Sequence, residues 1–204
     1  SFGDVPVYNF NPIPSSEANT DIGTLKGLLL VRGNKVGKHT DIPVEPDKAD
    51  YTDESGYFYK DDYEEAYREY EKKVEVFNME IDASAIVAVQ AEFDQLIHGI
   101  VTTINDILCP NKEVITSEGE KILIFDAENA PVGMDANKTP GEALFNRKSM
   151  DRYEKTTEII EVDGVFQEVE VWKYNEEDAS NNYSLFTLGE IEVNENIMKD
   201  PSII

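Results

Sequence analysis

A long helical pattern in the middle of the chain constrains the fold more than any other feature of the sequence. Apolar residues recur there at alternating intervals of four and three, the spacing of one face of an α-helix. The pattern loses phase around residues 82–85, so it permits one long helix with a stutter, or two helices of which Asp82 or Ser84 caps the second. An unbroken helix would be about 70 Å long, a length typical of a rod, and Pro110 would end it. The apolar residues are Tyr63, Tyr67, Tyr70, Val74, Phe77 and Ile81, then Ile86, Val89, Phe93, Leu96, Ile100, Ile104 and Ile107.

After residue 112 the pattern changes to alternation of apolar and polar residues, which is typical of β-strands. Residues 121–125 are a predicted strand, and residues 157–174 are a predicted hairpin that turns at Asp163 and Gly164. In its second half, Val171 and Trp172 fall on opposite faces. The sequence therefore predicts an α+β fold. Residues 1–112 would form a rod-like, mainly helical domain with an extended N-terminal segment and an acidic insertion at 34–60, and residues 113–204 an antiparallel β-rich domain.

The net charge excludes some classes of function. The chain has 42 acidic and 18 basic residues and a formal charge of −24. Nucleic-acid binding requires a basic surface, and an anionic membrane would repel this chain, so we expect neither partner. Cys109 is the single cysteine, which excludes an intrachain disulfide and a Cys₄ zinc site and favours a small buried side chain. We expect no membrane span and no signal peptide.

One row of polar residues is a candidate for chemistry. Asp94 and His98 are one helical turn apart, and Asn105 follows two turns later. On a helical wheel the apolar face centres near Phe93, Ile100 and Ile104, which places the polar row at the hydrated flank of the buried face. A local pair between Asp94 and His98 is the favoured interpretation, because a catalytic or metal site needs a further ligand or nucleophile that the neighbouring sequence lacks.

The loop from Asp126 to Glu142 invites a calcium interpretation, because Asp135, Asn137 and Thr139 alternate. It fails the EF-hand pattern, since Gly141 comes one place late and Asn146 stands where the bidentate Glu belongs. A turn-rich loop is the favoured interpretation. The sequence also lacks the G-x-S-x-G motif and the spacing of a phosphate-binding loop. We expect no catalytic residue, no metal and no cofactor.

Three stretches in a fixed order carry a family resemblance. They are GTLKGLLLVRG at 23–33, FDQLIHGIVTTIND at 93–106 and TPGEALFNRKSM at 139–150, the last preceded by a loop rich in Asp, Asn and Gly. This order resembles the middle of the flagellar hook-associated protein 1 family, the hook–filament junction proteins. The resemblance covers residues 23–32 and 88–147, and residues 34–80 look like an insertion or an extended helix. The matching positions are Gly23, Gly27, Leu28, Arg32, Asp94, Leu96, Ile104 and Asn105.

The resemblance implies a structural subunit that acts by self-assembly and not by catalysis. Such subunits join the flagellar hook to the filament, so the partners would be other copies of the chain and adjacent hook and hook-associated proteins. They reach the cell exterior through the flagellar type III export apparatus, without a cleaved signal peptide. The chain would be a central fragment without the terminal polymerising helices and monomeric at low concentration. Asp94 and Asn105 would hold packing or interface positions.

Two alternatives belong to other classes of protein. An extracellular calcium- or glycan-binding module would use the loop at Asp126–Glu142 and exposed aromatic residues such as Tyr51, Tyr57 and Tyr59. A hydrolase would use Asp94 and His98. Calcium-dependent melting distinguishes the first alternative, and the surroundings of Asp94, His98 and Asn105 distinguish the second.

Overall fold

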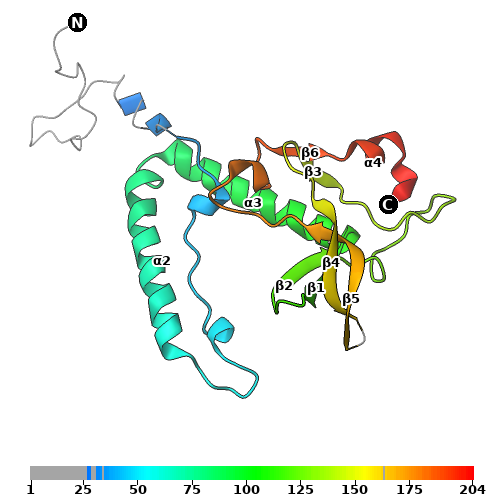
Figure 1. Cartoon of the computed structure of the whole chain (residues 1–204). Coiled ribbons are helices and arrows are strands. Elements are labelled where there is room, and N and C mark those ends of the chain that lie inside the picture. Colours follow the sequence, from blue (N-terminus) through cyan, green and yellow to red (C-terminus); the bar gives the residue numbers. More distant parts are fainter. Residues whose placement is uncertain (1–26, 29–30, 34, 163) are drawn as a thin grey trace, which may run out of the picture. The chain divides into compact units, whose positions relative to one another are not determined.

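The fold is α+β, as the sequence predicts. The computed structural model describes residues 27–28, 31–33, 35–162 and 164–204 (Figure 1). Within them lie two long helices, a short helix and an antiparallel sheet. The chain divides into two compact units, one ending at Gln95 and the other running from Leu96 to Ile204. The extended segment expected at the N-terminus and Gly23 lie outside the described residues.

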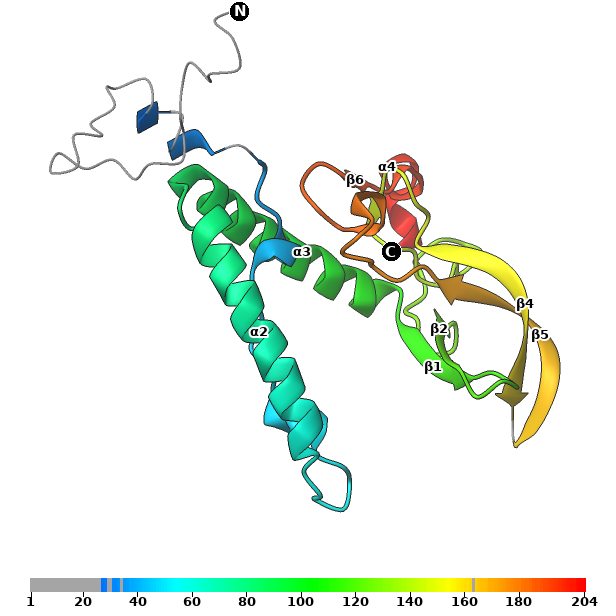
Figure 2. The same cartoon turned by 60° about the vertical axis from the view of Figure 1, so that its left-hand side comes forward.

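The helical pattern forms two helices instead of one. They are α2 (Lys60–Glu80) and α3 (Ala85–Leu108), preceded by the 3-10 turns η1 (His39–Asp41) and η2 (Lys48–Tyr51). The break lies where the pattern loses phase, and the chain changes direction there (Figure 2). The Ser84 hydroxyl donates to the carbonyl of Val31 at 2.6 Å, so this side chain ties the break to an earlier segment. The interpretation of the pattern as two helices is correct, and an unbroken helix of about 70 Å is not formed.

The first unit has a small apolar core around this break. Ile81, Val87 and Ala91 are buried, and Phe77 and Ile42 pack against them. A Cβ atom at Gly37 would overlap the carbonyl oxygen of Val87, so only glycine permits this approach to α3.

The second unit contains a four-stranded antiparallel sheet with the order β1-β2-β5-β4. A separate pair of strands, β3 and β6, is also antiparallel. The strands are β1 (Asn111–Ile115), β2 (Lys121–Phe125), β3 (Phe145–Arg147), β4 (Tyr153–Val162), β5 (Val165–Tyr174) and β6 (Ile191–Val193). The unit ends with η3 (Asn182–Ser184), α4 (Glu195–Lys199) and η4 (Pro201–Ile203).

The predicted hairpin and the predicted strand at 121–125 are confirmed. The hairpin pairs β4 with β5 from Tyr153 opposite Tyr174 to Val162 opposite Val165. Val171 is buried and Trp172 on the other face is half-exposed, as alternation requires. The core of the sheet consists of Ile122, Ile124, Ile160 and Val171.

The boundary between the two units falls inside α3, whereas the sequence places it at the change from helix to strand near residue 112. The physical reason is that the second half of α3 packs on the β-rich part. Asn105 is hydrogen-bonded to Phe145, and a Cβ atom at Gly141 would overlap the carbonyl oxygen of Leu108. These contacts give the second unit its own helical element.

Candidate functional site

The buried face of α3 carries polar residues together with apolar ones, contrary to the expectation. Asp94 is 2 % exposed and Asn105 is 0 % exposed, whereas Phe93 is 51 % and Leu96 57 % exposed. The prediction that the polar row lies at the hydrated flank of an apolar buried face is therefore wrong. The buried residues of α3 are spaced by three, four or seven positions: Val87, Ala91, Asp94, Val101 and Asn105. The buried Ser84 directly precedes the helix.

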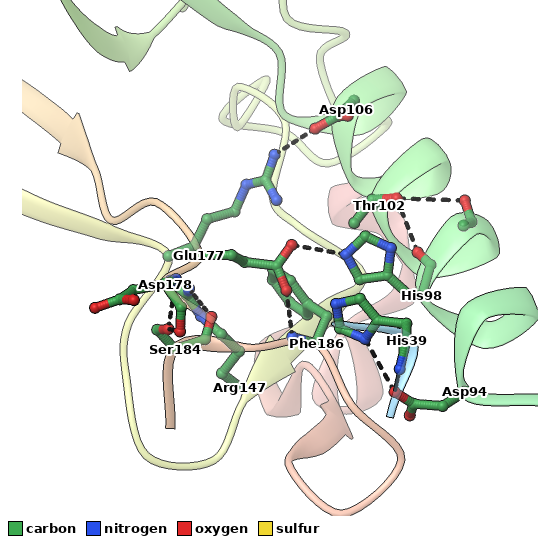
Figure 3. A network of polar contacts seen from close by, with 12 residues as sticks. His39, Asp94, His98, Thr102, Asp106, Arg147, Glu177, Asp178, Ser184 and Phe186 are labelled. Atoms are coloured by element: carbon green, nitrogen blue, oxygen red, sulfur yellow. Dashed lines mark hydrogen bonds and ion pairs between the residues drawn. The ribbon is translucent and has the colours of Figure 1, made fainter. Parts of the chain in front are cut away.

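In the first unit, Asp94 holds the segment that precedes α2. Its Oδ2 atom accepts a hydrogen bond from the backbone N–H of His39 at 2.9 Å and lies 2.9 Å from the His39 Nδ1 atom (Figure 3). The two residues are 55 positions apart in the sequence. A buried carboxylate requires such partners, because leaving it unpaired would cost several kcal/mol. Asp94 therefore pairs with His39, 55 positions away, whereas the sequence favours a local pair with His98.

In the second unit, His98 pairs with Glu177. The His98 Nε2 atom is 2.7 Å from Glu177 Oε2, and the other carboxylate oxygen of Glu177 accepts the backbone N–H of Phe186 at 2.6 Å (Figure 3). Glu177 thus links α3 to the segment after η3. The Thr102 hydroxyl donates to the carbonyl of His98 within the helix. His98 and Glu177 therefore each take part in a second hydrogen bond, which involves the backbone.

Both polar atoms of the Asn105 side-chain amide form hydrogen bonds with the backbone of a single residue, Phe145. Its Nδ2 atom donates to the Phe145 carbonyl at 2.9 Å, and its Oδ1 atom accepts the Phe145 N–H at 3.0 Å. The side chain therefore acts as a backbone partner for β3 and satisfies two polar groups that packing removes from water. This role is structural.

Two buried arginines were missed by the sequence analysis. Arg147 is 3 % exposed, donates to the carbonyls of Ser184, Asp151 and Asn175, and stacks at 5.0 Å over the ring of Phe186. Burial lowers the pKa of Arg147. The carbonyls of Ser184 and Asn175 lie 37 and 28 residues away from Arg147, so no local pattern marks these contacts.

Arg152 closes the end of α3. Its Nη2 atom donates to Asp106 Oδ1 at 2.8 Å and to the carbonyl of Cys109 at 3.3 Å. A cation in this position interacts favourably with the C-terminal end of a helix. Cys109 itself is buried, and burial raises the pKa of its thiol, which agrees with the predicted small buried side chain.

The loop at 126–142 is a set of tight turns. Asp135 accepts hydrogen bonds from the N–H groups of Asn137 and Thr139 and from the Thr139 hydroxyl, at 2.8–3.1 Å. The bond from the Thr139 N–H, more than any other contact, lowers the pKa of Asp135. Because these donors use the carboxylate oxygens that would bind calcium, the contacts of Asp135 favour the turn interpretation.

The aromatic residues named for glycan binding each contact another tyrosine ring. Tyr51 meets Tyr63 of α2 edge to face at 5.7 Å, and Tyr57 meets Tyr59 at 5.1 Å. Tyr57 is 63 % exposed. Asp53 accepts from the N–H of Tyr57, so the turn that carries this residue is internally bonded.

The described positions that carry the family resemblance differ in exposure. Gly27, Leu28 and Arg32 lie in short helical stretches of the described residues, with Leu28 and Arg32 exposed. On α3, Leu96 is exposed and Ile104 is half-buried, in contrast to the buried Asp94 and Asn105 described above.

Comparison of the chain with protein-family models, curated proteins and solved structures gives no match. In the described part of the chain, no helix combines the length and the apolar character needed to cross a bilayer. The support for a function therefore comes from the side chains described above and from the resemblance in the sequence.

Proposed function

We propose that this chain is a structural part of a self-assembling protein, a subunit at the hook–filament junction of the bacterial flagellum. The observation that carries the proposal is the exposed apolar face of α3. Large apolar side chains lie along it with heptad spacing and are 42–66 % exposed. They are Ile86, Val89, Phe93, Leu96, Ile100 and Ile107, and we call them the α3 stripe.

An exposed stripe of this kind is typical of a surface that another protein surface covers. Covering the exposed half of each side chain would contribute about 1 kcal/mol per residue. Heptad spacing selects a helix as the covering element, because knobs on one helix then meet holes on the other at every turn. The rod-like helical half expected from the sequence is part of this proposal. Helices packed along the stripe would form a bundle with α3.

The polar residues of α3 support a structural role over a catalytic one. Asp94, His98 and Asn105 each bind a residue far along the chain and thereby hold a segment in place. A hydrolase would need the Asp94 carboxylate and the His98 imidazole to face a substrate, whereas these groups are bonded to His39 and Glu177. The acidic composition fits a protein that remains soluble at high concentration, as an exported subunit must.

On this proposal, the partners are copies of the same protein and adjacent hook and hook-associated proteins. The protein would act outside the cell after type III export. The three stretches at 23–33, 93–106 and 139–150 support this assignment through their resemblance to the junction family.

Deletion of the encoding gene in the native bacterium tests the proposal. Electron microscopy is expected to show hooks without attached filaments, because filament subunits would lack the junction on which to assemble. Complementation with the natural gene should restore filaments, as should Glu65→Gln, a change on the exposed surface of α2. Phe93→Asp should restore few filaments, because it places a charge on the α3 stripe. Filaments of normal number and length in the deletion strain would refute the proposal.

A further inference from the structure

A glycine interrupts the exposed face of α3 in an unexpected place. Gly99 lies in the middle of the helix and is exposed, and a Cβ atom built there would meet nothing within 4 Å. Glycine in a helix interior is costly relative to alanine, because it loses more backbone freedom on folding. No described contact within the chain requires this glycine, in contrast to Gly37 and Gly141. Gly99 therefore leaves a notch that a second helix could enter closely.

The flanks of the α3 stripe differ in charge. Between Ala85 and Leu108 there is no Lys or Arg. Glu92, Gly99 and Asp106 are spaced by seven residues, so they follow one flank of the stripe. Glu92 and Asp106 are exposed, and Asp106 forms an ion pair with Arg152 of the same chain at 2.8 Å. The other flank carries neutral residues at the same spacing: Gln90, Ile97 and Ile104.

We propose that the α3 stripe docks one amphipathic helix of a neighbouring subunit, which passes close to α3 at Gly99 and places Lys or Arg beside Glu92. This inference rests on the proposed function, because it names the partner surface of the same stripe. The acidic flank determines the charge of the partner, and the notch determines where the helices come closest.

A second copy of α3 fits this surface poorly. In a parallel pair, the flank with Glu92 would lie against the neutral flank of the other copy, which would remove a carboxylate from water without giving it a cation. In an antiparallel pair, acidic flanks would face each other. The net charge of −24 adds repulsion between two copies.

Two designed helical peptides serve as probes. Both have Leu at the apolar heptad positions, and the flanking positions are Lys in one and Glu in the other. Fluorescence anisotropy with the whole chain should show the Lys peptide binding at least about tenfold more tightly, equivalent to roughly 1.4 kcal/mol. Glu92→Gln should reduce this preference. Equal affinity for the two peptides would overturn the proposed charge complementarity.

Gly99→Ala separates docking from folding, because the two effects have opposite signs. The added methyl group meets open space and raises helix propensity, so the melting temperature should rise by about 2–4 °C. The same methyl group narrows the notch, so affinity for the Lys peptide should fall severalfold. Gly189→Ala, which also meets open space, should leave that affinity unchanged.

If Gly99→Ala and the wild-type chain bind the Lys peptide equally, the proposed close approach is wrong. A Lys peptide that does not bind the wild-type chain overturns the proposed partner. Neither result bears on the deletion strain, where filament loss depends on the junction function alone. The two proposals therefore fail independently.

Discussion

The substitution Asn105→Ala tests the structural role of the buried polar face most sharply. The change removes two hydrogen bonds and leaves the N–H and the carbonyl of Phe145 without their partner. Asn105 is 0 % exposed, so water does not replace the lost amide without local opening. Each unsatisfied buried group costs about 1–3 kcal/mol, which gives a predicted loss of about 4 kcal/mol in the free energy of unfolding.

Urea titration followed by the fluorescence of Trp172 measures this loss. Trp172 is the single tryptophan of the chain and lies on β5, in the same unit as Asn105. Thr103→Ala is the matched control, since Thr103 lies on the exposed side of α3. It should keep the stability of the natural chain, because alanine has the higher helix propensity.

Asn105→Asp adds a second, pH-dependent test. The carboxylate retains the acceptor for the Phe145 N–H but places an oxygen against the Phe145 carbonyl, so the variant should be unstable at neutral pH. Acid should restore part of the stability as the new carboxyl group gains a proton that it can donate. A loss below about 1 kcal/mol for Asn105→Ala would refute the reasoning, because the two bonds would then be replaceable.

Further predictions concern the second unit. Gly141→Ala should cost about 2–3 kcal/mol in the free energy of unfolding, since its Cβ would overlap the carbonyl oxygen of Leu108, whereas Gly189→Ala should cost little; equal melting temperatures would contradict this. Burial raises the pKa of Tyr153, so stability should be complete below the unfolded tyrosine pKa of about 10 and fall as pH rises above it. Tyr153→Phe should flatten that alkaline decline in a urea titration series, and an unchanged slope would contradict the assignment. Excess calcium should leave the melting temperature unchanged, because the oxygens of Asp135 are already hydrogen-bonded; a rise in melting temperature would favour the calcium-binding alternative.

The strand at 121–125 and the β4–β5 hairpin were predictable because their signals are local. The Asp-Gly sequence at 163–164 and the alternation on both sides of it specify the β4–β5 hairpin without reference to the rest of the chain. The break between α2 and α3 was also visible, as a loss of phase at 82–85. The sequence alone left open whether a stutter or a new helix followed, because Ser84 finds its partner at Val31, 53 residues away.

The orientation of α3 was not predictable in the same way. The helix has one face of large apolar residues and one face on which Asp94 and Asn105 lie among Val and Ala, and hydrophobicity selects the first face as buried. The structure buries the other face, because Asp94 and Asn105 satisfy backbone groups of distant segments. Such partners are invisible to a pattern read along one helix. The same reason hides Arg147, whose partners Ser184 and Asn175 lie 37 and 28 residues away.

The central claim is that a helix of another subunit covers the apolar face of α3 in an assembly. The most direct measurement is photo-cross-linking in the native bacterium, with a photoreactive amino acid at position 93 on the stripe or at position 65 on α2 as the control. The account predicts strong cross-links from position 93 to a hook or hook-associated subunit and weak ones from position 65. Cross-links of equal strength from both positions, or none from position 93, would contradict it.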